Sequence, residues 1–248
     1  LLDEPGSYLH SSAQKELLKE LQKVSTTNTL LYCTHSHYLL DPSVIRLGSI
    51  RIAEKENANI SLTNYGNFKG KNETGALSPI YHALQLNIAN EFIGNIAIFE
   101  GITDFYLFSI VKRNSSHISS HINLIAGSGA GCSTTLITLG LSFAENFVVI
   151  FDNDKGGKEA VKKYTKEFGE TINNHFYYYS EKDDFKLENL ISEKDSNFLL
   201  EKTGCNSIKK SLGIFFYDKK EHHKEFVDNL SKDTLQNFKR IFTRINSL

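Results

Sequence analysis

The chain has 248 residues, of which 40% are hydrophobic and 23% are charged, and its formal net charge is −1. This composition is typical of one large globular domain or two small ones, and it excludes binding of nucleic acid through an overall positive charge. No apolar run reaches about 18 residues, so we expect no membrane span. The three cysteines have neither zinc nor disulfide spacing, which favours a reducing, cytoplasmic compartment.

The first 64 residues are predicted to form a strand, a helix, a second strand and a short hairpin. Leu1-Leu2 is typical of a strand end, and apolar residues at helical spacing predict a helix over 11–24. We expect the next strand over 29–34 and the hairpin over 51–62. Because a strand normally needs about five residues, we interpret the chain as the C-terminal part of a longer protein.

Residues 65–94 are expected to connect this part to a second one. The stretch Asn64 to Glu73 is polar and rich in glycine, which is typical of a linker. A helix is predicted over 78–92 and leads into the second part.

The second part alternates strands and helices. Strands are expected at 95–100, 121–126, 147–152 and 174–180, and helices at 103–113, 133–144, 156–168 and 187–200. This alternation predicts an α/β domain with a mainly parallel sheet over 95–205. Residues 206–248 are expected to form a C-terminal helical segment with a lysine-rich polar face.

Acidic residues follow two of these predicted strands. Glu100 and Asp104 come after the first strand, and Asp152 and Asp154 come after Phe147–Phe151, an unbroken apolar run typical of a strand buried on both faces. A single aspartate at a strand end is commonly a helix cap. If the two strands are neighbours, however, the four carboxylates crowd one sheet edge and repel one another, which a divalent cation with oxygen ligands would relieve.

The pattern Glu-Gly-x-Thr-Asp at 100–104 followed by Asp-x-Asp-x-Gly at 152–156 resembles the Toprim domain of topoisomerases, primases and OLD-family nucleases. Residues 125–130, Ile-Ala-Gly-Ser-Gly-Ala, match the glycine-rich turn of OLD-like sequences. They are not a phosphate-binding loop, because Cys132 stands where that motif needs its second glycine. The resemblance covers about residues 95–210 and implies Mg²⁺ or Mn²⁺ as cofactor, in a site for two ions.

The resemblance implies two further site positions. OLD-like domains carry an acid after the fourth strand, and Glu188 matches it, with Asn189 in place of a second acid. Such domains also carry a lysine that neutralises phosphate charge, for which Lys209 and Lys210 are both candidates. A solvated helix acid and a solvated lysine pair are the alternatives, and the sequence does not choose between the two lysines.

The N-terminal part resembles the end of an ABC-type ATPase. Leu-Leu-Asp-Glu-Pro at 1–5 is similar to a Walker B motif, and Thr34-His35-Ser36 to the H-loop. The resemblance implies that Asp3 holds the Mg²⁺ shell, Glu4 polarises the attacking water, and His35 contacts the γ-phosphate. Because no Gly-x4-Gly-Lys-Ser/Thr occurs, we expect the P-loop, and therefore ATP hydrolysis, to belong to a longer parent protein.

The combination of ABC ATPase and Toprim domain is the architecture of the OLD family, which includes the nuclease of the Gabija phage-defence system. It implies a metal-dependent DNA endonuclease, a homo-oligomer formed through the ATPase domain, and a possible defence partner protein. Glu100, Asp152 and Asp154, with Lys209 or Lys210, are then the catalytic candidates. The metal ligands are Glu100, Asp104, Asp152, Asp154 and Glu188.

Lysines 155, 158, 162, 163 and 166 follow the Asp-x-Asp motif and lie close in sequence to the expected metal site. Lys155, Lys158 and Lys162 are our candidates for DNA contacts, because clustered lysines neutralise phosphates. A solvated helix face carries the same residues. Alternative functions are a primase-like polymerase and a non-catalytic DNA-binding regulator that is gated by ATP.

Overall fold

The computed structural model describes residues 1–41, 44–56, 59–65, 94–118, 120–127, 129 and 133–247. These residues divide into two compact units, the first within 1–65 and the second within 94–247. Most of the expected linker and the helix expected at 78–92 lie outside the described residues. Within the described ranges, no helix is long and apolar enough to cross a membrane.

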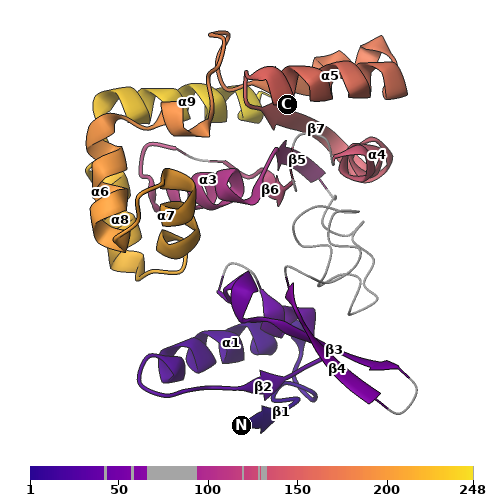
Figure 1. The fold of residues 1–248 in the computed structure, drawn as a ribbon, viewed down its shortest axis with the longest axis vertical. Coiled ribbons are helices and arrows are strands. Elements are labelled where there is room, and N and C mark those ends of the chain that lie inside the picture. Colours follow the sequence, from indigo (N-terminus) through magenta and orange to yellow (C-terminus); the bar gives the residue numbers. More distant parts are fainter. Residues whose placement is uncertain are drawn as a thin grey trace. The chain divides into compact units, whose positions relative to one another are not determined.

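The first unit contains a parallel strand pair and an antiparallel hairpin (Figure 1). Its elements in chain order are β1 (Leu2–Asp3), α1 (Ser11–Ser25), β2 (Tyr32–Cys33), the 3₁₀ helices η1 (His37–Leu40) and η2 (Leu47–Ser49), β3 (Arg51–Glu56) and β4 (Asn59–Asn64). The strand expected over 29–34 is therefore only two residues long. Leu18, Leu21 and Leu39 are buried and hold α1 against the following segment.

The second unit is built on a four-stranded sheet in which every neighbouring pair is parallel, in the order β6-β5-β7-β8. The strands are β5 (Gly94–Phe99), β6 (Asn123–Ala126), β7 (Ala144–Phe151) and β8 (Phe176–Tyr178). The helices are α3 (Ile102–Asn114), α4 (Thr134–Phe143), α5 (Lys155–Phe168), α6 (Glu193–Thr203), α7 (Ile208–Phe215), α8 (Lys220–Asp228) and α9 (Lys232–Asn246), with 3₁₀ turns η6 (Glu170–His175) and η7 (Leu187–Leu190). The predicted α/β class with a parallel sheet is confirmed.

Helices cover both faces of this sheet, because side chains along β5 and β7 alternate between the two faces. Ala97, Phe99, Val148 and Ile150 face the core that contains α3 and α6–α9. The alternate residues of the two strands face the core formed with α4 and α5. Figure 1 shows α6, α7 and α8 on one side of β5 and β7 and α4 on the other. Two buried faces explain why the C-terminal parts of both strands, Ile96–Phe99 and Phe147–Phe151, are apolar without interruption.

One expectation for the C-terminal half differs from the structure. The helix expected over 187–200 is interrupted, since η7 ends at Leu190 and Ser192 caps a new helix by accepting the Asp195 amide. The segment expected to be helical after residue 206 contains α7, α8 and α9. Their buried side chains, including Phe215 and Phe238, belong to the core of the sheet, and local sequence does not reveal such packing.

Candidate functional site

Glu100 and Asp152 come together at the carboxyl edge of the sheet. β5 and β7 are direct neighbours, and Phe99 is in register with Ile150. The next residues of the two strand ends therefore meet: the Asp152 backbone amide donates to Glu100 Oε2 over 3.2 Å. Asp152 is buried, whereas Glu100 is partly exposed. The adjacency on which the sequence-based prediction depended is thus present.

Asp104 lies one turn into α3 and is buried beside these two acids. The hydroxyl of Tyr179, which is also buried, donates to Asp104 Oδ1 over 2.5 Å. The Tyr179 ring stacks on Phe108 with 5.8 Å between ring centroids. The residue that follows β8 by one position therefore holds the Asp104 carboxylate in place.

The Asp-x-Asp loop is held from both of its ends. Asp152 Oδ1 accepts the Leu187 amide at 2.8 Å, and Asp154 caps α5 by accepting the Gly157 amide at 2.9 Å. A Cβ at Gly157 would lie 2.0 Å from the Asp152 carbonyl oxygen, so only glycine allows this close approach. The glycine in the motif thus has a steric reason that does not depend on any ligand.

The glycine-rich turn after β6 supports the Glu100 end of β5. The Gly127 amide donates to the Phe99 carbonyl at 2.9 Å and the Gly129 amide to the Glu100 carbonyl at 2.8 Å. A Cβ at Gly127 would lie 2.3 Å from the Phe99 oxygen. The amides of these two glycines thus bind protein backbone, and the other residues of 127–132 lie outside the described ones.

The electrostatics of the acids reflect burial and mutual repulsion. Burial raises the pKa of Glu100 from 4.5 to about 7, and the charges of Asp152, Asp104 and Asp154 add to the increase. Burial, followed by the charge of Asp104, raises the pKa of Asp152 from 3.8 to about 6. Burial also raises the pKa of Asp104. For Asp154 the Gly157 amide and the ammonium of Lys186 lower the pKa. Three of the four carboxylates are therefore destabilised as anions.

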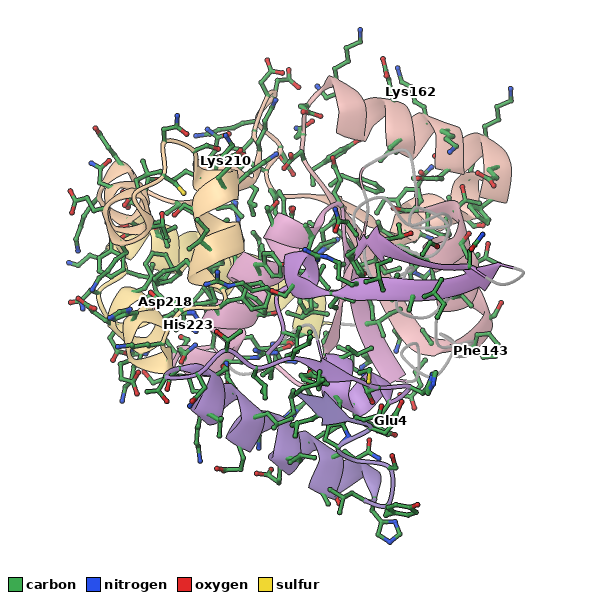
Figure 2. The ribbon with its side chains drawn as sticks, turned by 60° about the horizontal axis from the view of Figure 1, so that its bottom comes forward. Glu4, Phe143, Lys162, Lys210, Asp218 and His223 are labelled. Atoms are coloured by element: carbon green, nitrogen blue, oxygen red, sulfur yellow. The ribbon has the colours of Figure 1, made fainter. Side chains whose placement is uncertain are left out.

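Glu188 and Lys209 bring the predicted C-terminal residues to the same edge. Lys209 Nζ lies 3.6 Å from Glu188 Oε1, and its charge lowers the pKa of both Asp104 and Asp152. Glu188 Oε2 is buried without a hydrogen-bond partner. Lys210, labelled in Figure 2, is exposed on α7 and makes no ion pair within the described part of the chain. The structure therefore distinguishes the two lysines, which the sequence did not.

The donor set suits a hard divalent cation, although the acids are not gathered around one point. Every candidate ligand is a carboxylate, as Mg²⁺ and Mn²⁺ prefer, and Glu188 Oε2 is a buried oxygen that has no hydrogen-bond donor and could accept a cation. Among the described residues, however, no three acidic, histidine or cysteine side chains lie close enough to hold an ion between them. The two outer acids, Asp154 and Glu188, instead contact lysines.

The lysines of α5 are less available than their spacing suggests. Lys155 lies 3.9 Å from Glu159, and Lys158 pairs with Asp183. Lys162 is exposed and points away from the helix (Figure 2). One of the three predicted DNA-contacting residues is thus without an ion pair among the described residues, and the other two would have to exchange theirs for phosphate.

The first unit brings its three predicted ATP-site residues to one strand end. Asp3 pairs with Cys33 across β1 and β2, and His35 Nε2 lies 3.7 Å from Glu4 Oε1. Thr34 Oγ1 donates to Glu4 Oε2 at 3.2 Å. Glu4 has a φ of 41°, a left-handed conformation that costs a non-glycine residue about 1–3 kcal/mol and is common at functional sites. Glu4, labelled in Figure 2, is thus held in a strained turn beside His35.

Two residues of the second unit escape prediction from the sequence. Tyr179 is one of three consecutive tyrosines, and only the buried position of its hydroxyl distinguishes it from Tyr178, which is 36% exposed. Lys186 Nζ lies 3.3 Å from Asp154 Oδ2, although 32 positions separate the two residues in sequence. Neither contact has a local sequence signal, because each depends on where the chain returns to the sheet edge.

Comparison with known proteins does not identify the chain. No model of a known protein family matches it, and no curated protein is significantly similar in sequence.

Proposed function

We propose that the second unit is a Toprim-type endonuclease domain that hydrolyses DNA phosphodiesters with the help of divalent cations. The observation that carries this proposal is the contact of Glu100 with Asp152, with Asp104 buried one turn into the following helix, at the carboxyl edge of a parallel sheet, which is where α/β folds place their ligands. Burial and mutual repulsion raise the pKa values of Glu100 and Asp152. Strongly shifted pKa values of this kind cluster at functional sites.

Bound Mg²⁺ or Mn²⁺ would neutralise charge on the scissile phosphate and increase the acidity of a water molecule. Glu100, Asp104, Asp152, Asp154 and Glu188 are the residues that would hold it. Glu100 Oε2 accepts the Asp152 amide, so Oε1 is the atom that takes the proton of the attacking water. The Lys209 ammonium beside Glu188 supplies positive charge toward the phosphate oxygens. The water oxygen forms a bond to phosphorus while the P–O bond to the leaving sugar oxygen breaks, and that oxygen takes a proton from solvent water. The products are an alcohol and a phosphate monoester.

For the first unit we propose a part of an ABC-type ATPase site. The supporting observation is the strained Glu4 beside His35 and Thr34 at the end of the β1–β2 pair. A catalytic glutamate next to a histidine is the arrangement that polarises water at a γ-phosphate. The rival function, a DNA-binding regulator without nuclease activity, requires no acids to converge on one sheet edge, and the adjacency of Glu100 and Asp152 therefore favours the nuclease.

The test is cleavage of supercoiled plasmid DNA by the whole chain with Mg²⁺ or Mn²⁺. We expect cleavage that EDTA abolishes, and a loss of about a hundredfold or more in Glu100→Gln and Asp152→Asn, the size typical of losing an acid–base group. Glu181→Gln removes an exposed carboxylate after β8 and serves as the control, which should retain wild-type activity. Unimpaired cleavage by Asp152→Asn would contradict the proposal, as would cleavage that persists in EDTA.

A further inference from the structure

The outer acids of the site are each in contact with a lysine. Lys186 Nζ lies 3.3 Å from Asp154 Oδ2, and Lys209 Nζ lies 3.6 Å from Glu188 Oε1. The inner acids, in contrast, are held by uncharged donors: the Tyr179 hydroxyl and the backbone amides of Leu187 and Asp152. The ammonium groups of the two lysines therefore lie next to the outer carboxylates, at positions that a bound cation would also occupy.

Lys186 reaches Asp154 because the backbone around it is joined to the Asp-x-Asp loop. The Asn153 amide donates to the Phe185 carbonyl at 2.8 Å, and the Leu187 amide donates to Asp152 at 2.8 Å. Lys186 thus lies between two residues that are hydrogen-bonded to this loop. Its own amide donates to Asn189 Oδ1 at 2.8 Å. Asn189 therefore caps the η7 turn, a structural role that requires an amide or a carboxylate and no metal.

Both carboxylate oxygens of Asp154 have a partner while Lys186 is in place. Its Oδ1 caps α5 by accepting the Gly157 amide, and its Oδ2 contacts Lys186. The cap is part of the helix start, and Gly157 is fixed there by its contact with the Asp152 backbone. The exposed ammonium is the partner that can leave, since an exposed ion pair is weak and a lysine stem is flexible.

From this geometry we infer that Lys186 is a positioning residue that occupies Asp154 Oδ2 in the cation-free protein and competes with the divalent cation for that oxygen. The inference rests on the proposed nuclease site. In this inference Asp154 is held toward Lys186 in the cation-free protein, and binding of the ion exchanges one positive partner for another. Lys209 at Glu188 differs, because Glu188 keeps a second oxygen that is buried and unpaired.

The experiment is a calorimetric titration of the whole chain with Mn²⁺, without nucleotide or DNA and at low ionic strength, where exposed charges act most strongly. Lys186→Gln removes the competitor. Lys158→Gln is the matched control, because it also removes one positive charge from an ion pair of similar exposure, with 43% of the lysine side chain accessible against 47% for Lys186. Its partner, Asp183, is not one of the site acids.

We expect Lys186→Gln to bind Mn²⁺ about three- to fivefold more tightly than the wild type, the range expected when one exposed ion pair no longer has to break. Lys158→Gln should change the affinity by less than about twofold. Lys186→Arg should bind Mn²⁺ with the affinity of the wild type, because arginine keeps the positive charge. Equal or weaker binding by Lys186→Gln relative to Lys158→Gln would overturn the inference alone. Absence of Mn²⁺ binding in the wild type would instead overturn the proposed cation site, and this inference with it.

Discussion

Replacing Glu100 with glutamine should stabilise the cation-free protein, even though it removes a proposed catalytic group. The carboxylate is destabilised by burial and by three neighbouring acids, whereas the amide carries no charge. Glutamine keeps an oxygen at the position that accepts the Asp152 amide, so the hydrogen bond at 3.2 Å survives the substitution. The effect of the substitution is therefore mainly that of one negative charge.

The size and pH dependence of this effect follow from the pKa. The folded-state pKa of about 7 lies above the ordinary value of 4.5, so the folded protein holds the proton more tightly than the unfolded chain. The contribution of Glu100 to stability is therefore greatest below pH 4.5 and is lost as the pH rises through 7. The pKa difference corresponds to about 3 kcal/mol at 1.36 kcal/mol per pKa unit, which we reduce to about 1–2 kcal/mol because Glu100 is partly exposed to solvent.

The assay is urea unfolding in EDTA, followed by circular dichroism and by hydrogen exchange of the β5 and β7 amides, which reports on the second unit alone. At pH 8 Glu100→Gln should be more stable than the wild type by about 1–2 kcal/mol, and near pH 4.5 the two should be equal. Glu181→Gln is the control for loss of an exposed charge. A constant difference at both pH values, or a destabilised variant at pH 8, would refute the assignment of Glu100 as a strained carboxylate.

Two further predictions concern Tyr179 and the first unit. Tyr179→Phe should lower the free energy of unfolding by about 1–3 kcal/mol and impair plasmid cleavage, because the buried Asp104 loses its donor, whereas Tyr178→Phe at the exposed neighbour should do neither. Equal behaviour of the two variants would contradict a positioning role for Tyr179. The chain alone should release no phosphate from ATP, since its sequence has no P-loop to cradle the phosphates, and turnover that Glu4→Gln abolishes would show that interpretation to be wrong.

The strands and the inner acids of the site could be predicted from the sequence, because the patterns that indicate them lie in neighbouring residues. Phe147–Phe151 is an apolar run that forms the buried end of β7, and the acids follow the strand where the pattern placed them. The expected strand starts differ from the observed ones by at most three residues. That β5 and β7 are neighbours could only be assumed, because order in a parallel sheet depends on crossovers and not on the strand residues.

The outer part of the site was not predictable, because it depends on tertiary packing. Lys209 and Lys210 are consecutive residues of one helix, and only the packing of α7 decides that the first contacts Glu188. The break between η7 and α6 likewise depends on Thr234 of α9, whose hydroxyl accepts the Ser192 amide at 2.8 Å. A helix drawn through residues 187–200 would have moved Glu188 and separated Lys186 from Asp154.

The negative charges of the site acids are offset in two different ways, and which way applies depends on how deeply the carboxylate is buried. The inner carboxylates are surrounded by protein, where an ammonium would be costly to bury, and they depend on hydrogen-bond donors and raised pKa values. The outer ones reach solvent, where a flexible lysine can approach and leave at little cost. Both kinds of compensation are reversible, since a proton and an ammonium can each be replaced by a stronger cation. We therefore expect this edge of the sheet to give up protons and ammonium contacts when the proposed divalent cation binds.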